Sequence, residues 1–482
     1  GLTDALSLEE RRNATFLFVT PLSGRRAKWL SSQKANGRAA WVKDRLEERE
    51  WKDVRVIGGA SLIDWLHLYP SVEAWFAAQV LGSPALDLES PTNHWAKISR
   101  VGNPHLTPAV FLVGRDKAAA KVASVLEGTV PHLRLATHFP ADVPDFVAGY
   151  IAGLDPEVQL DMSRQCLIVS NEDAWRTAAG LTMPHTLVAG PRLDLSGTVG
   201  RELIQVAKNN GHRVILGAPK GGKPDQVTCR LSTPSPNQIR VALEGAGYPR
   251  EQARALSRKG EGSLDGLLRS IQGLSVLTTW AQDAAAATLT LCALIGQWDE
   301  SNPADCDAIE RLSGKVYGEW IETVREAAAR PGIPLKHHAG TWRFTSRYEG
   351  WHALGARLFD EHLDRFAVVV TEVLDEDDPA LSLPVGERYL AAIHGLKHTY
   401  STQMREGLAS GLAILGSLPE ALTHCATGHA ESVAAHTVKA LLEPGTWQRW
   451  ATLDRLMPLL AEAAPREFLT AVTRDVSVFE SL

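Results

Sequence analysis

Short apolar runs recur between residues 109 and 219, and a stretch with helical periodicity follows most of them. The five runs are AVFLVG, LRLAT, QCLIVS, HTLVAG and HRVILGAP. As a group they do not alternate apolar with polar residues, so strands built from them are buried on both faces. Because such burial is typical of a parallel sheet with helices on each side, we predict an α/β domain here.

The pattern changes on either side of this domain. Upstream, TFLFVT and DVRVIGG predict strands of an incomplete α/β unit, and a proline-rich stretch after it predicts a linker. Downstream, the sequence predicts helices, except where PLKHH and TWRFTS predict a β-hairpin that turns at Ala339–Gly340. Two helices and a hairpin are the order of a winged-helix domain. The predicted regions are an α/β N-terminal part (1–84), a linker (85–108), an α/β core (109–232), a helical lid (233–273), a winged helix (274–346) and an all-α C-terminal region (347–482).

Composition limits the classes of function. A chain of 482 residues is too long for one ordinary core, and its net charge of −6 gives no global basic field to attract nucleic acid. The five cysteines are scattered, which indicates a reducing compartment and argues against a thiolate zinc site. No apolar run reaches the roughly 18 residues of a membrane span, and no signal peptide is recognisable. We expect a cytoplasmic protein without a membrane partner, and further sequence upstream of Gly1.

The stretch PHLRLATHFPADVPDFVAGYIAGL has the layout of a nucleotide site, which is a strand, a loop and a helix. In a phosphate loop, glycines and a lysine lie at this junction, and backbone N–H groups hold the phosphates. Here the loop HFPADVPD contains no glycine and no lysine, and the helix begins without serine or threonine. We predict no nucleotide-binding residues and no cofactor, since neither ATP nor magnesium has a motif, and interpret the loop as a scaffold element.

Metal-dependent cleavage of nucleic acid would need two or more acidic groups and a lysine around a divalent ion. The tripeptide EWK places Glu50 and Lys52 at a suitable spacing beside a strand. It also follows the charged stretch DRLEERE, so ordinary surface charge is the alternative. His394 and His398 have a spacing that can bind a metal on a helix, but no third ligand is near in sequence. We predict no metal site and no complete active site in this chain.

Two basic segments are candidates for contact with DNA phosphates. The first is RRAKWLSSQKANGRAAWVKDR, and the second is the predicted hairpin with the residues after it. A solvated helix is the alternative for the first segment. For the second, Trp342 and Phe344 would pack on the helices at 306–328, whose acidic residues would repel phosphate. The candidate DNA-binding residues are Arg25, Arg26, Lys28, Lys336, Arg343 and Arg347.

The order of these parts resembles a known family. VGRDKAAAKVASVL resembles the box that opens the nucleotide-binding module of STAND-type ATPases, and PSPNQIRVALEGAGYPREQARALSRKGEGSLDGLLR resembles their helical lid. In those proteins a winged helix and a helical C-terminal region follow. The resemblance covers roughly residues 109–346 and implies a P-loop-like core. It is a degenerate core, because the family's phosphate-binding lysine and threonine have no counterparts here.

Residues 14–82 are similar to the later part of a restriction-endonuclease-like domain. Together the two resemblances imply a bacterial anti-phage protein, of which this chain is the regulatory and sensor portion, not itself hydrolysing nucleotide. Any nuclease activity would need residues upstream of Gly1. The implied partners are DNA or a phage-derived trigger, and a second copy of the chain. Two alternatives stay open, a DNA-binding regulator that uses the winged helix and an unconventional NTPase.

Overall fold

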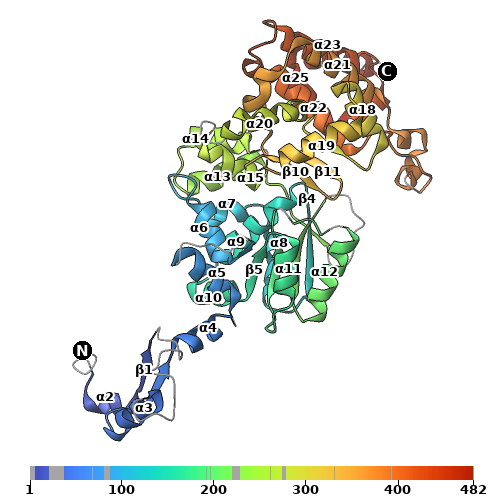
Figure 1. Ribbon diagram of the computed structural model, residues 1–482. Coiled ribbons are helices and arrows are strands. Elements are labelled where there is room, and N and C mark those ends of the chain that lie inside the picture. The colour runs from blue at the N-terminus through green and yellow to red at the C-terminus, as the bar shows by residue number, and fades with distance from the viewer. Residues whose placement is uncertain are drawn as a thin grey trace.

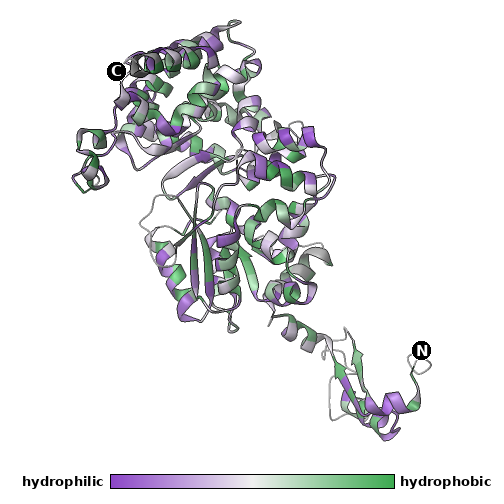
Figure 2. Ribbon diagram, turned by 180° about the vertical axis from the view of Figure 1, so that it is seen from behind, coloured by the Kyte–Doolittle hydropathy of each residue, from purple (hydrophilic) through white to green (hydrophobic). Residues whose placement is uncertain are grey.

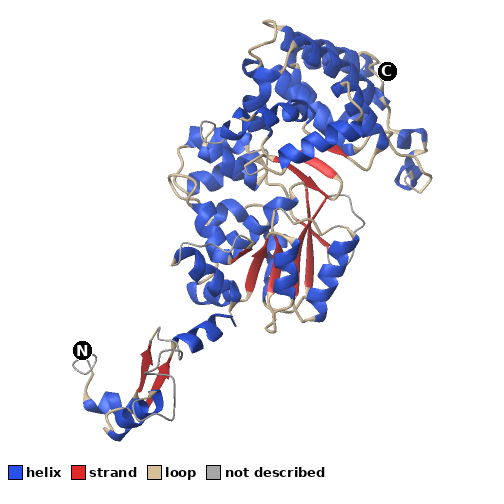
Figure 3. Cartoon of the chain, viewed as in Figure 1, coloured by secondary structure: helices blue, strands red, loops and turns tan. Residues whose placement is uncertain are grey.

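The computed structural model shows a mixed α/β chain in which helices predominate (Figure 1). A small N-terminal unit, an α/β core and a helical half follow one another along the molecule. Figure 3 shows strands in three separate places. The structure describes residues 6–20, 37–67, 69–80, 87–191, 193–195, 197–219, 228–260, 262–273, 278–330, 332–391 and 393–480.

A six-stranded sheet forms the centre of the α/β core. Its strand order is β3-β5-β6-β7-β4-β8, and every neighbouring pair is parallel except β3 with β5. The predicted parallel sheet is therefore confirmed, with one antiparallel strand at its edge. The strands are β3 (Leu88–Glu89), β4 (His132–Thr137), β5 (Cys166–Val169), β6 (Thr186–Ala189), β7 (Arg213–Pro219) and β8 (Thr228–Arg230).

Helices cover both faces of this sheet. Along β5, Cys166 and Ile168 belong to one hydrophobic cluster and Leu167 and Val169 to another, because successive strand residues point to opposite faces. The first cluster includes residues of α8 and α9, and the second includes residues of α11 and α12. Figure 2 accordingly shows the strands as hydrophobic. The helices are α8 (Asp116–Leu126), α9 (Val143–Ala152), α10 (Pro156–Arg164), α11 (Glu172–Ala179) and α12 (Thr198–Asn209).

The run AVFLVG, predicted as a strand, instead contributes its first four residues to helix α7 (Pro108–Leu112). Pro108 occupies the first turn of the helix, where the missing N–H is no loss, and Val110 and Phe111 are buried. A short buried helix and a buried strand have the same apolar pattern, so periodicity did not separate them.

Residues 85–108, predicted as a linker, contain β3 and helix α6 (Pro91–Ser99). The side chain of Ser90 accepts a hydrogen bond from the backbone N–H of Asn93, and Pro91 opens the helix. Ile98 and Leu106 lie in the core of the α/β domain. One of the prolines that suggested a linker is thus at a helix start, and this correction moves the segment into the α/β core.

The N-terminal unit has two strands where the sequence predicted them, β1 (Thr15–Val19) and β2 (Asp53–Ile57), and the structure pairs them in parallel. Leu17 and Val19 remain largely exposed among the described residues. Helices α2 (Leu8–Asn13) and α3 (Arg38–Glu47) belong to this unit. Helix α4 (Gly59–His67) leads from it to α5 (Pro70–Gln79), which packs in the α/β core against β3, β5 and α10. Figure 1 shows this unit beside the α/β core, on the side away from the helical half.

Three helices follow β8 and are called the lid helices below. They are α13 (Pro236–Gly245), α14 (Arg250–Lys259) and α15 (Leu264–Gln272). The side chains of Ser235 and Ser263 cap the first and the last by accepting backbone N–H bonds. These helices link the α/β core to the helical half (Figure 1).

The predicted hairpin is present and belongs to a three-stranded antiparallel sheet of order β10-β11-β9. Ala339 (φ 49°) and Gly340 (φ 81°) form its turn, and both adopt the left-handed region that two-residue hairpin turns require. Trp342 and Phe344 are buried, and Trp342 stacks on Trp298 with ring centroids 5.7 Å apart, which confirms internal packing. The elements are α17 (Thr290–Ile295), β9 (Gln297–Asp299), α18 (Pro303–Ser313), α19 (Tyr317–Ala328), β10 (Leu335–His338) and β11 (Thr341–Phe344).

The described residues after the hairpin form helices and connecting loops. A single hydrophobic cluster joins it to the hairpin sheet, and α22 contributes buried residues along most of its length. The helices are α20 (Arg347–Leu354), α21 (Asp360–Asp375), α22 (Thr402–Ser417), α23 (His429–Leu442), α24 (Trp447–Leu453), α25 (Met457–Ala463) and α26 (Pro465–Glu480).

Replacing Trp298 by alanine should destabilise the helical half by about 3–5 kcal/mol. The ring of Trp298 is fully buried, it packs on Trp320 and Trp342, and its N–H donates to Tyr317. The control is Trp447→Ala, because that side chain is 45% exposed and its loss should cost about 1 kcal/mol or less. Urea unfolding followed by circular dichroism measures both variants. Equal losses would contradict this account of the core.

Candidate functional site at the carboxyl edge of the sheet

The loop at residues 138–142 leaves β4 at the carboxyl edge of the sheet, the edge where α/β proteins bind ligands. The backbone N–H of Phe139 donates to the hydroxyl of Thr137, and Pro140 has no N–H to offer. Pro140 also packs against Gly217 on β7, where an added Cβ would lie 2.7 Å from the Pro140 carbonyl oxygen. The loop is thus held against the sheet by close packing, without the row of outward N–H groups that cradles a phosphate.

Asp142 connects this loop to the lid helices. Its carboxyl group is buried (the residue is 1% exposed) and accepts hydrogen bonds from the backbone N–H groups of Leu264 (2.7 Å) and Asp265 (3.2 Å). The hydroxyl of Ser263 donates a third, at 3.1 Å. These donors lie at the start of α15, where a helix leaves N–H groups without internal partners. Asp142 therefore caps a lid helix 122 residues further along the chain.

Burial raises the pKa of Asp142 to about 7. The positive charge of Arg115 and the N–H groups of Leu264 and Asp265 oppose this rise, whereas the nearby carboxylate of Asp145 adds to it. A buried carboxyl group whose pKa lies near neutrality changes charge in the physiological range.

Arg115, the arginine of the GRD sequence, is a structural brace. It is buried, and its guanidinium donates to the carbonyl oxygens of Phe111 (2.9 Å) and Ser232 (3.1 Å). It also lies 5.9 Å from the ring centre of Phe146. One side chain thus connects α7, α9 and the segment after β8.

His94, which is largely enclosed, lies between two carboxylates. Its Nε2 is 2.6 Å from Asp145 and its Nδ1 is 3.1 Å from Glu89. Although burial disfavours the charged ring, these two partners raise the pKa of His94 to about 9. An imidazolium that donates from both nitrogens cannot act as a base, so this cluster supports α6 on α9 structurally. Sequence analysis missed it, because Asp145 is 51 residues from His94.

The hairpin lies over the same edge of the sheet. The guanidinium of Arg343 is 4.9 Å from the ring centre of Phe139, and it also bonds to Gln297. Lys336 donates to the carbonyl oxygen of Ile333 at 2.9 Å. These two predicted DNA-binding residues therefore also contact protein groups, and Arg343 does so at the edge of the sheet.

Arg347, also predicted to contact DNA, is buried and only 4% exposed. Its guanidinium donates to the carbonyl oxygens of Gly407 (2.8 Å) and Leu294 (2.6 Å) and lies against Gly296. A guanidinium enclosed in this way does not reach a phosphate, so the prediction for Arg347 is wrong. Its position just after the hairpin suggested exposure, but it begins a buried helix.

Two cavities flank the loop. One has a volume of about 980 Å³ and lies between the loop, the hairpin and the segment 388–406. The other, of about 830 Å³, lies between the loop, α14 and the helices α22 and α25. Volumes of this size are typical of small-ligand sites. The two cavities share His138, Phe139, Arg343, Glu406 and Arg455 in their walls, and together they are called the edge groove below.

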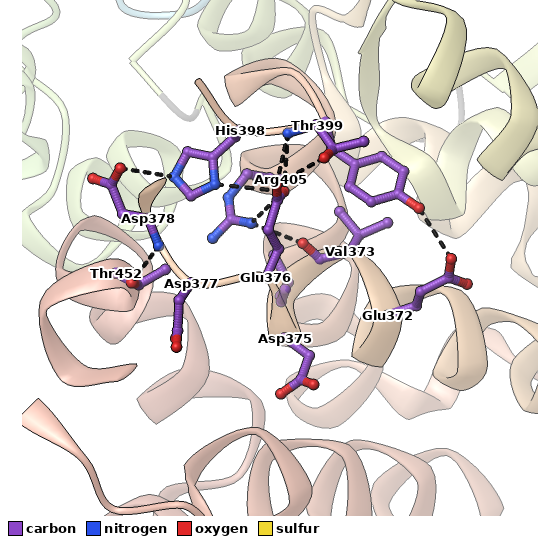
Figure 4. Close-up of polar contacts among 12 residues, drawn as sticks. Glu372, Val373, Asp375, Glu376, Asp377, Asp378, His398, Thr399, Arg405 and Thr452 are labelled. Atoms are coloured by element: carbon purple, nitrogen blue, oxygen red, sulfur yellow. Dashed lines mark hydrogen bonds and ion pairs between the residues drawn. The ribbon is translucent and has the colours of Figure 1, made fainter. Parts of the chain in front are cut away.

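The acidic run Asp375–Asp378 begins at the last residue of α21, and Figure 4 shows the polar groups around it. Arg405 donates to the carbonyl oxygen of Val373 (2.8 Å), and Arg449 donates to that of Leu374 (3.1 Å). The last carbonyls of a helix have no internal partners, so the two buried arginines cap α21.

The carboxylates of this run bind protein groups in turn. Glu376 accepts from the backbone N–H of Thr399 at 2.8 Å (Figure 4). Asp375 pairs with Arg449 at 2.7 Å. His398 lies 3.5 Å from Glu376, and burial together with the nearby Arg405 lowers the pKa of His398. Within the described residues, no three His, Cys, Asp or Glu side chains are placed to hold a metal ion.

The other sequence-predicted residues lie in the N-terminal unit. Glu50 accepts a hydrogen bond from Arg11 at 2.7 Å, and Lys52 is exposed with its backbone N–H bonded to Ala14. Glu50 is thus engaged in an ion pair rather than directed at Lys52. Arg25, Arg26 and Lys28 lie outside the described residues.

No known protein-family model matches this sequence, and no curated protein is significantly similar to it. Of the helices in the described ranges, none is both long and apolar enough to cross a membrane.

Asp142→Asn should remove a pH dependence of stability. The folded-state pKa of Asp142 lies above the ordinary aspartate value of about 4, so the folded protein keeps a proton that the unfolded chain has released. The resulting stabilisation is present below about pH 4 and is lost as the pH rises towards about 7. The melting temperature of the native protein should therefore fall relative to that of the variant as the pH rises from about 5 to about 8.

The matched control is Asp173→Asn, since the Asp173 side chain is 94% exposed. Its melting temperature should follow that of the native protein at every pH. A constant offset between native protein and Asp142→Asn would contradict the raised pKa.

Proposed function

We propose that this chain is the regulatory and sensor portion of a nuclease-linked, STAND-like protein of bacterial defence, and that it does not hydrolyse nucleotide. The order of its parts supports the proposal. A parallel sheet with a loop at the phosphate-loop position is followed by the three lid helices, then by a small β-sheet with two helices, then by a helical region.

A winged helix at 274–346 is supported by the arrangement of its elements. Strand β9 precedes α18 and α19, and the hairpin β10–β11 follows them and pairs with β9 through β11. In this arrangement the hairpin directs Trp342 and Phe344 inward, and Arg347 is buried. These contacts favour a wing that works inside the protein over one that binds duplex DNA, the second candidate.

The observation that supports the proposal most is that the loop at 138–142 binds other parts of the protein. Where a phosphate loop would present N–H groups and a lysine, this loop presents Phe139, Pro140 and Asp142, each engaged with another part of the protein. The carboxyl group of Asp142 would also repel a phosphate when ionised. The lid helices are thus fastened to the sheet by the protein itself.

Under this proposal, a trigger would bind the helical C-terminal region. Its effect would reach a nuclease domain through the lid helices and the sheet, which Asp142 holds together. The trigger could be DNA or a phage-derived molecule, and the chain could assemble with further copies of itself. The exposed apolar residues on the strands of the N-terminal unit, Leu17 and Val19, are compatible with a larger domain there.

Isothermal titration calorimetry with ATP and magnesium should show no binding in the micromolar range. The physical reason is the lack of phosphate donors in the loop, and the positive control is any P-loop ATPase under the same buffer. A micromolar dissociation constant that weakens in Asp142→Ala or Phe139→Ala would overturn the proposal in favour of an unconventional NTPase.

Incubation with plasmid DNA and magnesium or manganese should leave the DNA intact, because no acidic cluster for a metal is found in the described residues. Glu50 pairs with Arg11, so Glu50→Ala should change only the stability of the N-terminal unit, by about 1 kcal/mol or less. Cleavage that disappears in Glu50→Ala but persists in Glu48→Ala would show that the EWK tripeptide is catalytic after all.

A further inference from the structure

The edge groove is positively charged although the whole chain has a net charge of −6. Nine lysines and arginines line its two cavities, against four aspartates and glutamates. One arginine, Arg347, is buried, and Arg343 is stacked on Phe139. A local excess of cations in a concave site attracts anions more strongly than the same charges on an open surface.

Four of these cations are not engaged elsewhere in the described structure. No hydrogen bond or ion pair joins the side chains of Arg230, Arg258, Lys397 and Arg455 to another described residue. They come from four separate parts of the chain, which are the end of β8, the lid helix α14, the segment before α22 and the segment before α25. Four separate elements thus place, at the same groove, a cation that has no carboxylate partner among the described residues. This arrangement indicates an anionic ligand that spans the groove.

Aromatic rings lie among these cations. Tyr389, on the wall of the larger cavity, is 80% exposed, and Tyr348 lies on the wall of the smaller one. A groove that combines cations along its length with accessible aromatic rings is how proteins bind single-stranded nucleic acid, since phosphates pair with the cations and bases stack on the rings.

We infer that the edge groove binds single-stranded nucleic acid. The concave form favours a strand over a duplex, because duplex DNA is recognised by protruding helices or ribbons that enter its own grooves. The two cavities are neighbours that share Phe139 and Arg455 in their walls, and a ligand that contacts the cations of both must be longer than one compact nucleotide. This inference rests on the proposed function where it names the ligand that the regulatory portion would bind. The evidence for the site is separate and consists of the cations in the groove.

The test is fluorescence anisotropy of the full chain with a labelled oligothymidine of about twelve nucleotides. Each phosphate contact steepens the dependence of log affinity on log salt by about 0.7 for a single strand. The triple variant Arg230→Ala/Arg258→Ala/Arg455→Ala should therefore weaken binding at least about tenfold at about 50 mM salt and flatten the slope by about 2. Tyr389→Ala should weaken it at least about fivefold through lost stacking.

The matched control is Arg250→Ala/Arg254→Ala/Arg466→Ala, which removes the same charge from exposed positions outside the groove. It should keep native affinity within about twofold. The inference is overturned if the native protein does not bind the strand at low salt, if both triple variants weaken equally, or if a duplex of the same length binds as tightly. Such a result would leave the proposal about the loop intact, because that proposal is tested with ATP and with variants of Asp142 and Phe139.

Discussion

The arrangement of the α/β core and the helical half depends on one interaction, the capping of α15 by Asp142. One carboxyl group in the loop after β4 accepts hydrogen bonds from two backbone N–H groups and a hydroxyl at the start of α15. From the same helix, Arg269 donates to Glu349 on α20 at 3.1 Å, and Trp280 donates to that carboxylate at 2.7 Å. Helix α15 is thus a polar bridge between the sheet and the helical half.

This bridge has consequences for chemistry at the sheet edge. Buried hydrogen bonds to a group that can ionise contribute roughly 1.5–3 kcal/mol each, and removing one partner leaves the others unsatisfied. A ligand that competed for the loop would have to break these bonds, so the geometry favours a permanent joint over an exchangeable phosphate site. The positive charge of the region lies instead in the groove beside the loop, on side chains such as Arg230 and Arg455 that the joint does not use.

Sequence patterns predicted the elements that are decided locally. The buried strands, the hairpin turn at Ala339–Gly340 and the inward packing of Trp342 follow from apolar runs and turn chemistry, and the structure confirms them. Patterns failed where local rules are ambiguous, as with helix α7, whose short apolar run also suits a strand.

Patterns also failed where partners are distant in sequence. The bond from Leu264 to Asp142 spans 122 residues, and the contact between His94 and Asp145 spans 51. Arg347 looked like a surface cation because its acceptors, the carbonyl groups of Gly407 and Leu294, are more than 50 residues away. Whether an arginine is buried depends on acceptors that are distant in sequence. No local sequence pattern therefore distinguished the buried Arg347 from Arg343.

Amide hydrogen exchange across residues 233–273, with and without ATP and magnesium, tests the central claim most directly. If the protein itself fastens the lid helices to the sheet, the backbone N–H groups of Leu264 and Asp265 are protected by Asp142 in both conditions. The account predicts the same slow exchange with and without nucleotide. Exchange of this segment that slows or quickens when ATP and magnesium are added would show that the lid responds to nucleotide, and would contradict the account.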